Sequence, residues 1–380
     1  MIGHFASQIT PPLATTRRRM MQLLAFVALS TAGWLMLSIP AQAATSADTP
    51  QAEAARDGSH DYDFNIGKWH THIRRVLDPF AASKESIDLY GTVTVRPVWG
   101  GRAQLEEIEA DGPKGHWEGL SLFLYNPQSH QWSQTFINSK TVDFGPPLIG
   151  EFKDGRAEIF SSDTFKGKAI LVRGIWSNIA ADSHQYAEDY SNDGGTTWAP
   201  SFHAELTRDT NFDSQIPPMD AASDAGQHDF DFDLGSWKTH SSRLLNPLTG
   251  STKWVQMEGT TKVSKVWNGR ANLAEYKADG PAGPIELLAL RWFNPTTHEW
   301  NIDFATPGVG TLGIPGIGAF KNGRADFYDY EPINGRSVLV RFSIWSITAD
   351  TAQSEQAFSV DGGKTWEVNW INKYERVRPE

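Results

Sequence analysis

The feature that most constrains this chain is an internal repeat with a long and constant separation. The stretch His60–Trp69 returns as His228–Trp237, 168 residues later, and each copy contains a Gly-x-Trp. The same separation relates Val98–Ala103 to Val266–Ala271. A repeat of this length indicates a duplicated domain, because solenoid repeats are only about 20–50 residues long. The chain is therefore expected to fold as two similar domains.

The separation changes in one short segment. Trp176 aligns with Trp345 at 169 residues, and the separation returns to 168 by Asp182 and Asp350. One extra residue that leaves the rest of a repeat in register is typical of a β-bulge. We therefore expect a bulge near these tryptophans.

The residues before the first repeat have the pattern of a targeting segment. Arg17–Arg19 precede an apolar run from Leu23 to Ile39, and Ala41–Ala43 follows as a small-residue cleavage site. This order predicts a signal peptide over residues 1–43 and a periplasmic or secreted mature protein. The run contains Ser, Thr and Gly and is shorter than the roughly 20 apolar residues of a membrane span, so stable membrane insertion is not expected. The arginines fit both a twin-arginine and an ordinary secretory signal.

Composition separates the repeats from their connections and excludes several partners. Residues 44–59 and 209–227 are rich in Ala, Ser, Asp and Pro, which predicts a flexible tether and a linker beside the repeats 60–208 and 228–377. The chain has no cysteine, which excludes disulfides and thiolate sites. Its net charge of −11 becomes more negative once the signal arginines are removed, so binding to nucleic acid is not expected.

Short runs rich in β-branched and aromatic residues recur in both repeats. Thr92–Val95, Leu120–Tyr125 and Ser337–Phe342 are examples, and Asp-Gly, Asn-Gly, Asn-Pro and Gly-Gly turn signals separate such runs. About ten strands fit in each repeat at this spacing. Antiparallel strands hide their edges by closing on themselves, so we predict an all-β fold of two tandem antiparallel β-barrels. A barrel of this kind encloses side chains or one small ligand.

The repeated Gly-x-Trp gives the predicted barrels a family resemblance. A Gly and a Trp on the first strand and an Arg on the last resemble the signature of the calycins, which include lipocalins, fatty-acid-binding proteins and nitrobindins. The residues are Gly67, Trp69 and Arg208, and again Gly235, Trp237 and Arg376. The resemblance implies that the Trp closes the barrel floor and the Arg packs across it, a structural role. The short connection 78–86 leaves no room for a helical lid, so the chain is most similar to lidless, nitrobindin-like barrels and to uncharacterised secreted bacterial domains.

Polar residues that recur in both copies beside apolar neighbours are the candidates for a ligand site. They are Thr71, His72, Arg75, Glu107 and Arg173 in the first copy, and Thr239, His240, Arg243, Glu275 and Arg341 in the second. Side chains alternate across a strand, so Thr71 and Arg75 share the face of Trp69, whereas His72 faces the other way unless a bulge turns it. A buried glutamate must be paired or protonated. The Glu and Arg side chains therefore either pair inside the barrel or orient a polar ligand head.

Metals and cofactors find little support in the sequence. His70 and His72 lie two positions apart, but a metal site needs three or four ligands, so no metal is expected. No cofactor is expected either. If haem binds, the resemblance to nitrobindins points to His184 or His203 as its ligand, and the second copy lacks both histidines.

Two motifs are better explained by turns than by function. Ser191–Trp198 and Ser359–Trp366 match the Asp-box of sialidases, but a propeller needs four to eight short blades, so we interpret them as hairpin turns. Gly308–Gly313 fits Gly-x-Gly-x-x-Gly, yet Pro315 forbids the helix that a nucleotide-binding motif requires. We expect a loop there.

Three functions remain open. The first is an exported protein that binds a small apolar or amphipathic molecule in a barrel lumen. The second is a lipocalin-like lyase, isomerase or hydrolase that uses Glu275 with Arg243, Arg341 and His240. The third is a structural or interaction module with filled barrels. The second copy keeps the more regular run Glu355–Ser359, so we expect the second barrel to be the active one if only one is.

Overall fold

The computed structural model describes residues 57–140, 144–210, 226–281, 283–333 and 335–378. The predicted signal peptide and most of the predicted tether and linker lie outside these residues. Ala55–Glu380 form one compact unit, which contains both repeats. No helix among the described residues is both long and apolar enough to cross a membrane.

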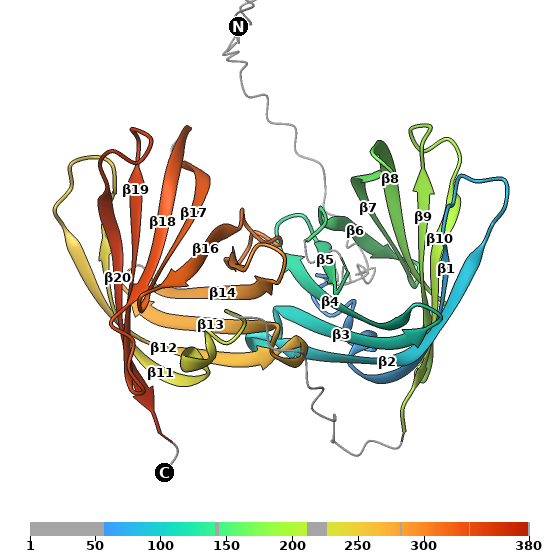
Figure 1. Ribbon diagram of the computed structural model, residues 1–380, viewed down its shortest axis with the longest axis horizontal. Helices are drawn as coiled ribbons and strands as arrows, with labels where there is room; N and C mark the ends of the chain where they lie inside the picture. Colours follow the sequence, from blue (N-terminus) through green and yellow to red (C-terminus); the bar gives the residue numbers. More distant parts are fainter. Residues whose placement is uncertain (1–56, 141–143, 211–225, 282, 334, 379–380) are drawn as a thin grey trace, which may run out of the picture. The chain divides into compact units, whose positions relative to one another are not determined.

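Each repeat folds into a closed antiparallel barrel of ten strands, in which neighbours in sequence pair and the last strand pairs with the first (Figure 1). The first barrel contains β1 (Gly67–Val76), β2 (Ser86–Val98), β3 (Ala103–Gly112), β4 (Gly115–Asn126), β5 (Gln131–Asn138), β6 (Leu148–Lys153), β7 (Arg156–Phe165), β8 (Lys168–Ser177), β9 (Ser183–Ser191) and β10 (Ala199–Arg208). The second contains β11 (Gly235–Leu244), β12 (Trp254–Val266), β13 (Ala271–Gly280), β14 (Gly283–Asn294), β15 (Glu299–Ala305), β16 (Gly316–Lys321), β17 (Arg324–Ile333), β18 (Arg336–Trp345), β19 (Thr351–Ser359) and β20 (Glu367–Val377). The prediction of tandem all-β barrels is confirmed.

A short segment before the first strand closes one end of each barrel. In the first barrel it includes the 3₁₀ turn η1 (Asp63–Asn65), and the indole of Trp69 donates a hydrogen bond to the Asn65 carbonyl at 2.8 Å. The Arg208 guanidinium lies 4.0 Å from the centre of the Trp69 ring and donates to the carbonyl of Ile66 at 3.2 Å. Trp237 and Arg376 repeat this stack at 4.0 Å beside η3 (Asp231–Asp233). These contacts form the barrel floor that the calycin resemblance implied.

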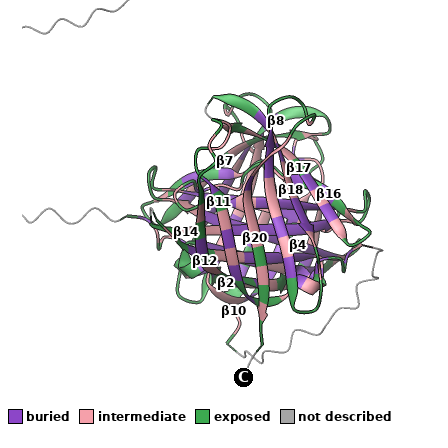
Figure 2. Ribbon diagram, turned by 90° about the vertical axis from the view of Figure 1, so that its left-hand side faces the viewer, coloured by how far each residue is buried: buried purple, intermediate pink, exposed green. Residues whose placement is uncertain are grey.

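Aromatic rings fill the barrel interior above the floor. Tyr62, which is fully buried, packs against the rings of Phe123, Trp132 and Phe152 at 4.9–5.1 Å between centroids. Phe230 takes the same position in the second barrel, 4.9 Å from Trp300. Figure 2 shows the resulting alternation of buried and exposed positions along many strands. The lower half of each lumen is therefore a packed core.

The prediction of a β-bulge near Trp176 and Trp345 is wrong. Ala157 pairs with Trp176, and Ala325 pairs with Ile344, so the separation of 168 residues persists there. The two barrels share a bulge elsewhere, between Pro200 and Phe202 and at the equivalent place in β20. Trp345 lies under the guanidinium of Arg324 at 5.3 Å and needs no inserted residue.

The two motifs interpreted as turns form turns. In the Ser191–Trp198 turn, the carboxylate of Asp193 accepts hydrogen bonds from the backbone N–H and hydroxyl of Thr197, which lowers the pKa of Asp193 to about 2. Gly308–Gly313 is a loop, and its Gly310 carbonyl accepts a hydrogen bond from the Ser133 hydroxyl of the first barrel at 2.6 Å.

An apolar interface joins the outer faces of the two barrels. One buried cluster contains Leu105, Leu120 and Leu122 from the first barrel together with Leu273 and Leu290 from the second. Its members occur in equivalent pairs, so each barrel presents the same surface to the other. Such an arrangement has the pseudo-two-fold character of an isologous dimer interface.

Glu107 and Glu275 lie in this interface, and the expectation that they face the barrel interiors is wrong. Glu107 accepts a hydrogen bond from the backbone N–H of Trp267 at 2.6 Å, and Glu275 accepts one from Trp99 at 2.8 Å. Both tryptophans, in the 3₁₀ turns η2 (Trp99–Gly101) and η4 (Trp267–Gly269), have positive φ angles of 53° and 52°. A strained backbone of this kind persists where surrounding contacts hold it.

We expect the interface to hold the barrels together without the linker. A chain cut by a protease at a site introduced into 209–227 should elute from size exclusion as one species. Leu105→Asp should separate the halves, because it places a charge in the apolar cluster. Leu171→Asp, on the outer face of β8 and 36% exposed, should not. Wild-type halves that separate after cutting would contradict a self-sufficient interface, provided that circular dichroism shows both to be folded.

Candidate functional site

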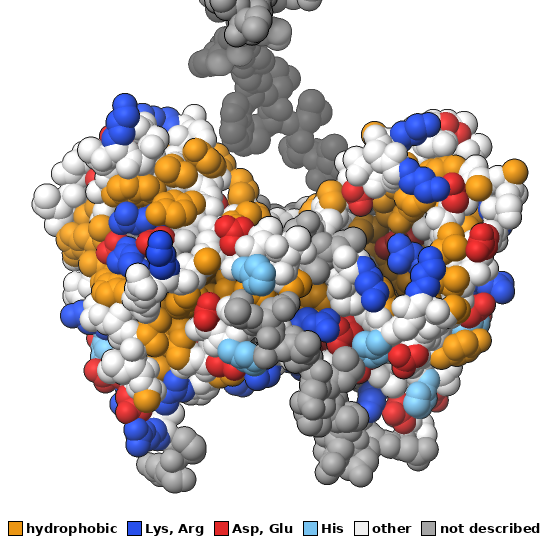
Figure 3. All heavy atoms as spheres, in the orientation of Figure 1, with side chains coloured by type: hydrophobic (Ala, Val, Ile, Leu, Met, Phe, Trp, Pro, Cys, Tyr) orange, Lys and Arg blue, Asp and Glu red, His pale blue; other side chains and the backbone are white. Residues whose placement is uncertain are grey.

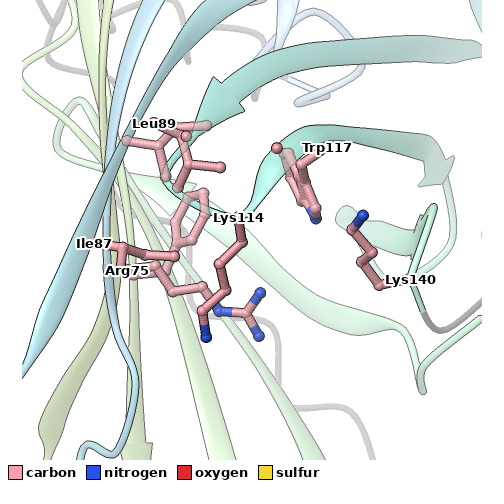
Figure 4. Close-up of a pocket in the computed structure, with 10 residues that line it drawn as sticks. Arg75, Ile87, Leu89, Lys114, Trp117 and Lys140 are labelled. Atoms are coloured by element: carbon pink, nitrogen blue, oxygen red, sulfur yellow. The ribbon is translucent and has the colours of Figure 1, made fainter.

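A cavity of about 100 Å³ opens at the end of the first barrel opposite the floor (Figure 4). Its wall is mainly apolar and comes from strands on both sides of β1. The apolar side chains are Ile73, Ile87, Leu89, Trp117 and Phe202. Gly112 and Gly115, at the β3–β4 turn, add no side chains of their own to the opening. The cavity is smaller than the roughly 300–1,000 Å³ of sites for drug-sized ligands, so it suits a small molecule or one end of a larger one.

Three cationic side chains surround this opening. Arg75, Lys114 and Lys140 line the cavity and are exposed. The Trp117 indole N–H is buried in the wall of the cavity and has no hydrogen-bond partner among the residues that the structure describes. Figure 4 shows Lys114 and Arg75 ending in the same region of the opening, with Lys140 beyond Trp117. The opening thus combines an apolar wall with donors and positive charge.

One carboxyl group inside the same barrel is influenced by Arg75. Glu188 accepts a hydrogen bond from the Tyr186 hydroxyl at 2.9 Å. Burial raises the pKa of Glu188, and the Tyr186 hydrogen bond and the positive charge of Arg75 oppose that rise. Arg75 is therefore partly compensated by an acid. Thr71 also lies in this interior, where its buried hydroxyl has no partner.

In the second barrel, several inward-pointing polar side chains bond one another. Thr239 bonds the hydroxyl of Thr261 at 2.7 Å, and Arg243 stacks on Trp370 at 4.9 Å. Asn372 links Ser241 to Ser354 through hydrogen bonds of 2.6 and 3.1 Å. The cavity described in this barrel measures about 20 Å³, room for little more than one water. Of the two cavities described, the larger lies in the first barrel, whereas the sequence favoured the second as the active one.

Four other candidate residues face away from the lumen. The inward placement expected of Arg173 and Arg341 is wrong, whereas His72 and His240 lie on the outward face that strand alternation predicted. Arg173 pairs with Asp189 at 2.8 Å and lies over Trp198, on the outside of β8. Arg341 pairs with Glu355 at 3.0 Å in the same way. His72 and His240 also point outward, since both lie on the strand face opposite Trp69 and Trp237; His72 contacts Asp88 at 2.9 Å, and His240 contacts Glu258 at 2.5 Å.

The histidines considered for haem do not border the open cavity. His184 lies at the floor, with its ring 4.3 Å from that of Trp69 and 5.1 Å from that of Phe64. Burial and the charge of Arg208 lower the pKa of His184 to about 4, so its ring is neutral at pH 7. His203 points outward, 3.6 Å from Glu205. In the part of the chain that the structure describes, no three His, Asp or Glu side chains group together as metal ligands.

Sequence reasoning missed Trp117, Lys114, Lys140 and Phe202. Lys114 lies in a turn and Lys140 follows a strand end. The second copy has Ala282 and Gly308 at their positions, so the two lysines are not among the residues that the repeat duplicates. Trp117 could have been found from its strand. It shares a face with Ser121 and Phe123 in β4, and Phe123 packs on the barrel floor.

Comparison with known proteins gives only weak similarities. No family model matches the chain, and no curated protein sequence matches it. An S-type phycobiliprotein lyase from Guillardia theta is 10% identical with a TM-score of 0.31, over 40% of this chain and 92% of that chain. A protein of unknown function from the DUF3598 family of Nostoc punctiforme is also 10% identical, with a TM-score of 0.23 over 84% of this chain and 99% of that chain.

A third similar structure is a double mutant of transferrin binding protein B from Haemophilus parasuis. It is 8% identical with a TM-score of 0.17, over 82% of this chain and 76% of that chain. At this level of similarity the fold assignment rests on the strand pairing of the two barrels themselves.

Proposed function

We propose that the first barrel binds a small, largely apolar molecule in the cavity at its open end, as an exported protein. The observation that carries this proposal is the apolar cavity of about 100 Å³ with an unpaired, buried indole N–H in its wall. Apolar walls supply the driving force for binding, and a few polar groups orient the ligand. The mature protein would then start near Ala44, after removal of the predicted signal peptide.

The enzymatic alternative has no assembled site among its candidate residues. Glu275 lies in the interface between the barrels, Arg341 and His240 point outward, and Arg243 stacks on Trp370. A general acid must lie within hydrogen-bond reach of the group that it serves, and these side chains serve different surfaces. The third alternative is supported in the second barrel by inward-pointing polar side chains that bond one another, such as Thr239 with Thr261 and Ser241 with Asn372.

The binding proposal is tested with a neutral apolar dye, N-phenyl-1-naphthylamine. The mature protein should bind the dye with enhanced fluorescence, and Ile87→Trp should abolish this binding because a larger ring fills the cavity mouth. Val255→Trp is the matched control, since Val255 takes the same place in the second barrel and pairs with Arg243 as Ile87 pairs with Arg75. The proposal is wrong if Ile87→Trp binds the dye as the wild type does.

The natural ligand can be sought at the same time. Native mass spectrometry of protein purified from its own host should show an adduct that organic solvent removes. The intact mass of the same sample reports whether residues 1–43 are absent. A full-length mass would contradict export by a cleaved signal.

A further inference from the structure

The cations around the first cavity point to the chemical class of its ligand. We propose that the ligand carries an anionic head group, such as a carboxylate, which stays at the rim while its apolar part enters the cavity. This inference rests on the proposed function, because it concerns the same site. It goes beyond that function by naming the charge of the ligand and the side chains that hold it.

The first argument is the charge around the opening. The chain has a net charge of −11, yet the side chains that line this cavity include three cations and no acid. Within the described residues, neither Lys114 nor Lys140 forms an ion pair. Arg75 is partly balanced by Glu188, whereas the two lysines leave a surplus of positive charge at the rim. An approaching anion is attracted by such a surplus. Figure 3 shows basic side chains among apolar ones on the face of the β1–β10 barrel that it draws.

The second argument is the Trp117 indole. Trp117 is only 8% exposed, and its indole N–H is buried with no partner in the described part of the chain. A buried donor without a partner costs free energy that a ligand oxygen would recover. In Figure 4 the indole nitrogen is on the side of the ring that is nearer to Lys140. A carboxylate between them accepts from both, and the apolar chain behind it contacts Leu89 and Phe202.

The third argument is the contrast with the second barrel. Arg243 is equivalent to Arg75, but its guanidinium stacks on Trp370 at 4.9 Å, and Trp370 donates to Asn372 at 2.9 Å. The two lysines have no basic counterparts in the second copy. The second barrel is therefore an internal control for the rim charges, because it has the same fold, its Arg243 stacks on Trp370, and it lacks the two lysines.

The experiment compares ligands that share one tail and differ in the head group. Octanoate, octan-1-ol and octylamine are each titrated against N-phenyl-1-naphthylamine bound to the mature protein, and loss of the dye fluorescence measures their affinity. Because the two unbalanced lysines each add a modest attraction, octanoate should bind about tenfold more tightly than octanol, and octylamine most weakly. The preference should shrink as salt is added, since exposed charges are screened.

Substitutions of the rim lysines test whether these residues cause the preference for octanoate. Lys114→Gln and Lys140→Gln together should bring octanoate to the affinity of octanol and leave octanol within about twofold of wild type. Arg243→Gln should change neither. Equal binding of octanoate and octanol to the wild type overturns the head-group proposal while the cavity proposal stands. Failure of every ligand, including the dye, to bind overturns both.

Discussion

Replacing Arg291 with leucine should destabilise the second barrel by about 3–5 kcal/mol, because it leaves a buried carboxylate without its partner. Arg291 is 7% exposed and pairs with Asp233 at 2.5 Å beneath the floor aromatic Phe230. Taking away one member of such a pair costs more than the pair itself contributes, since the remaining charge keeps its desolvation penalty. Chemical unfolding followed by fluorescence and circular dichroism would measure the change.

The first barrel supplies the compensating substitutions. Asn65 and Phe123 occupy the positions of Asp233 and Arg291, so uncharged side chains of these sizes fit here, but Ala274 replaces the Glu106 that accepts from Asn65. The double variant Asp233→Asn and Arg291→Phe should therefore recover part of the lost stability, because it leaves no charge unpaired. Arg378→Leu removes an exposed ion pair with Asp350 and should leave the unfolding midpoint unchanged. A double variant as unstable as Arg291→Leu alone would show that the loss comes from packing and not from the unpaired charge.

The same comparison explains how the two floors diverged. In the first barrel, Asn65 donates to Glu106 at 3.2 Å, and Ser121 donates to the other carboxylate oxygen at 2.8 Å. Burial raises the pKa of Glu106, and these two hydrogen bonds oppose the rise. The second barrel has alanines in place of Glu106 and Ser121 and uses an ion pair instead. The two floors therefore place their buried carboxylates among different partners: hydrogen-bond donors around Glu106 in the first barrel and the Arg291 guanidinium beside Asp233 in the second.

The repeat and its turn chemistry were enough to predict the architecture. A constant separation of 168 residues, β-branched runs and Gly-containing turns together predict two barrels of about ten strands, and the strand pairing confirms this. The Trp–Arg floor could also be anticipated, since Trp69 and Arg208 lie at fixed places on the first and last strands.

The alternation of side chains along β3 does not by itself predict which of its two faces points into the barrel. Leu105 and Glu107 share one face, and Gln104 and Glu106 share the other, but both faces are largely buried. One faces the lumen and the other faces the second barrel, and a period of two does not tell them apart. The apolar run Leu120–Tyr125 in the neighbouring strand was the available signal, because a continuous run indicates a strand covered on both faces.

The cavity rim could not be predicted because it depends on the turns between strands. Lys114 lies in the β3–β4 connection and Lys140 follows the end of β5, so no strand periodicity relates them to Arg75. Only the closure of the barrel brings the three together at one opening. The pairing of β1 with both β2 and β10 places Ile87 and Phe202 beside Arg75.

Asp303→Asn should make the protein more stable at high pH and leave it unchanged at low pH. Asp303 is 3% exposed, and burial, followed by the charge of Asp329, raises its pKa from 3.8 to about 8. Below pH 3.8 both the folded and the unfolded chain hold this proton. Between pH 3.8 and 8 only the folded chain keeps it, so the wild type loses stability as the pH rises through this window. Above pH 8 the loss is complete.

The size and sign of this effect can be checked against a second aspartate. The interval between the two pKa values corresponds to at most about 6 kcal/mol, which the asparagine variant should regain in urea unfolding at pH 9. Burial alone would raise the pKa of Asp326, but hydrogen bonds from Arg324 and Ser343 outweigh it and lower that pKa. Asp326→Asn should therefore destabilise the protein above pH 4, the opposite sign. A difference between Asp303→Asn and wild type that stays constant from pH 4 to 9 would contradict this prediction, because it would mean that Asp303 has the same protonation state in the folded and the unfolded chain.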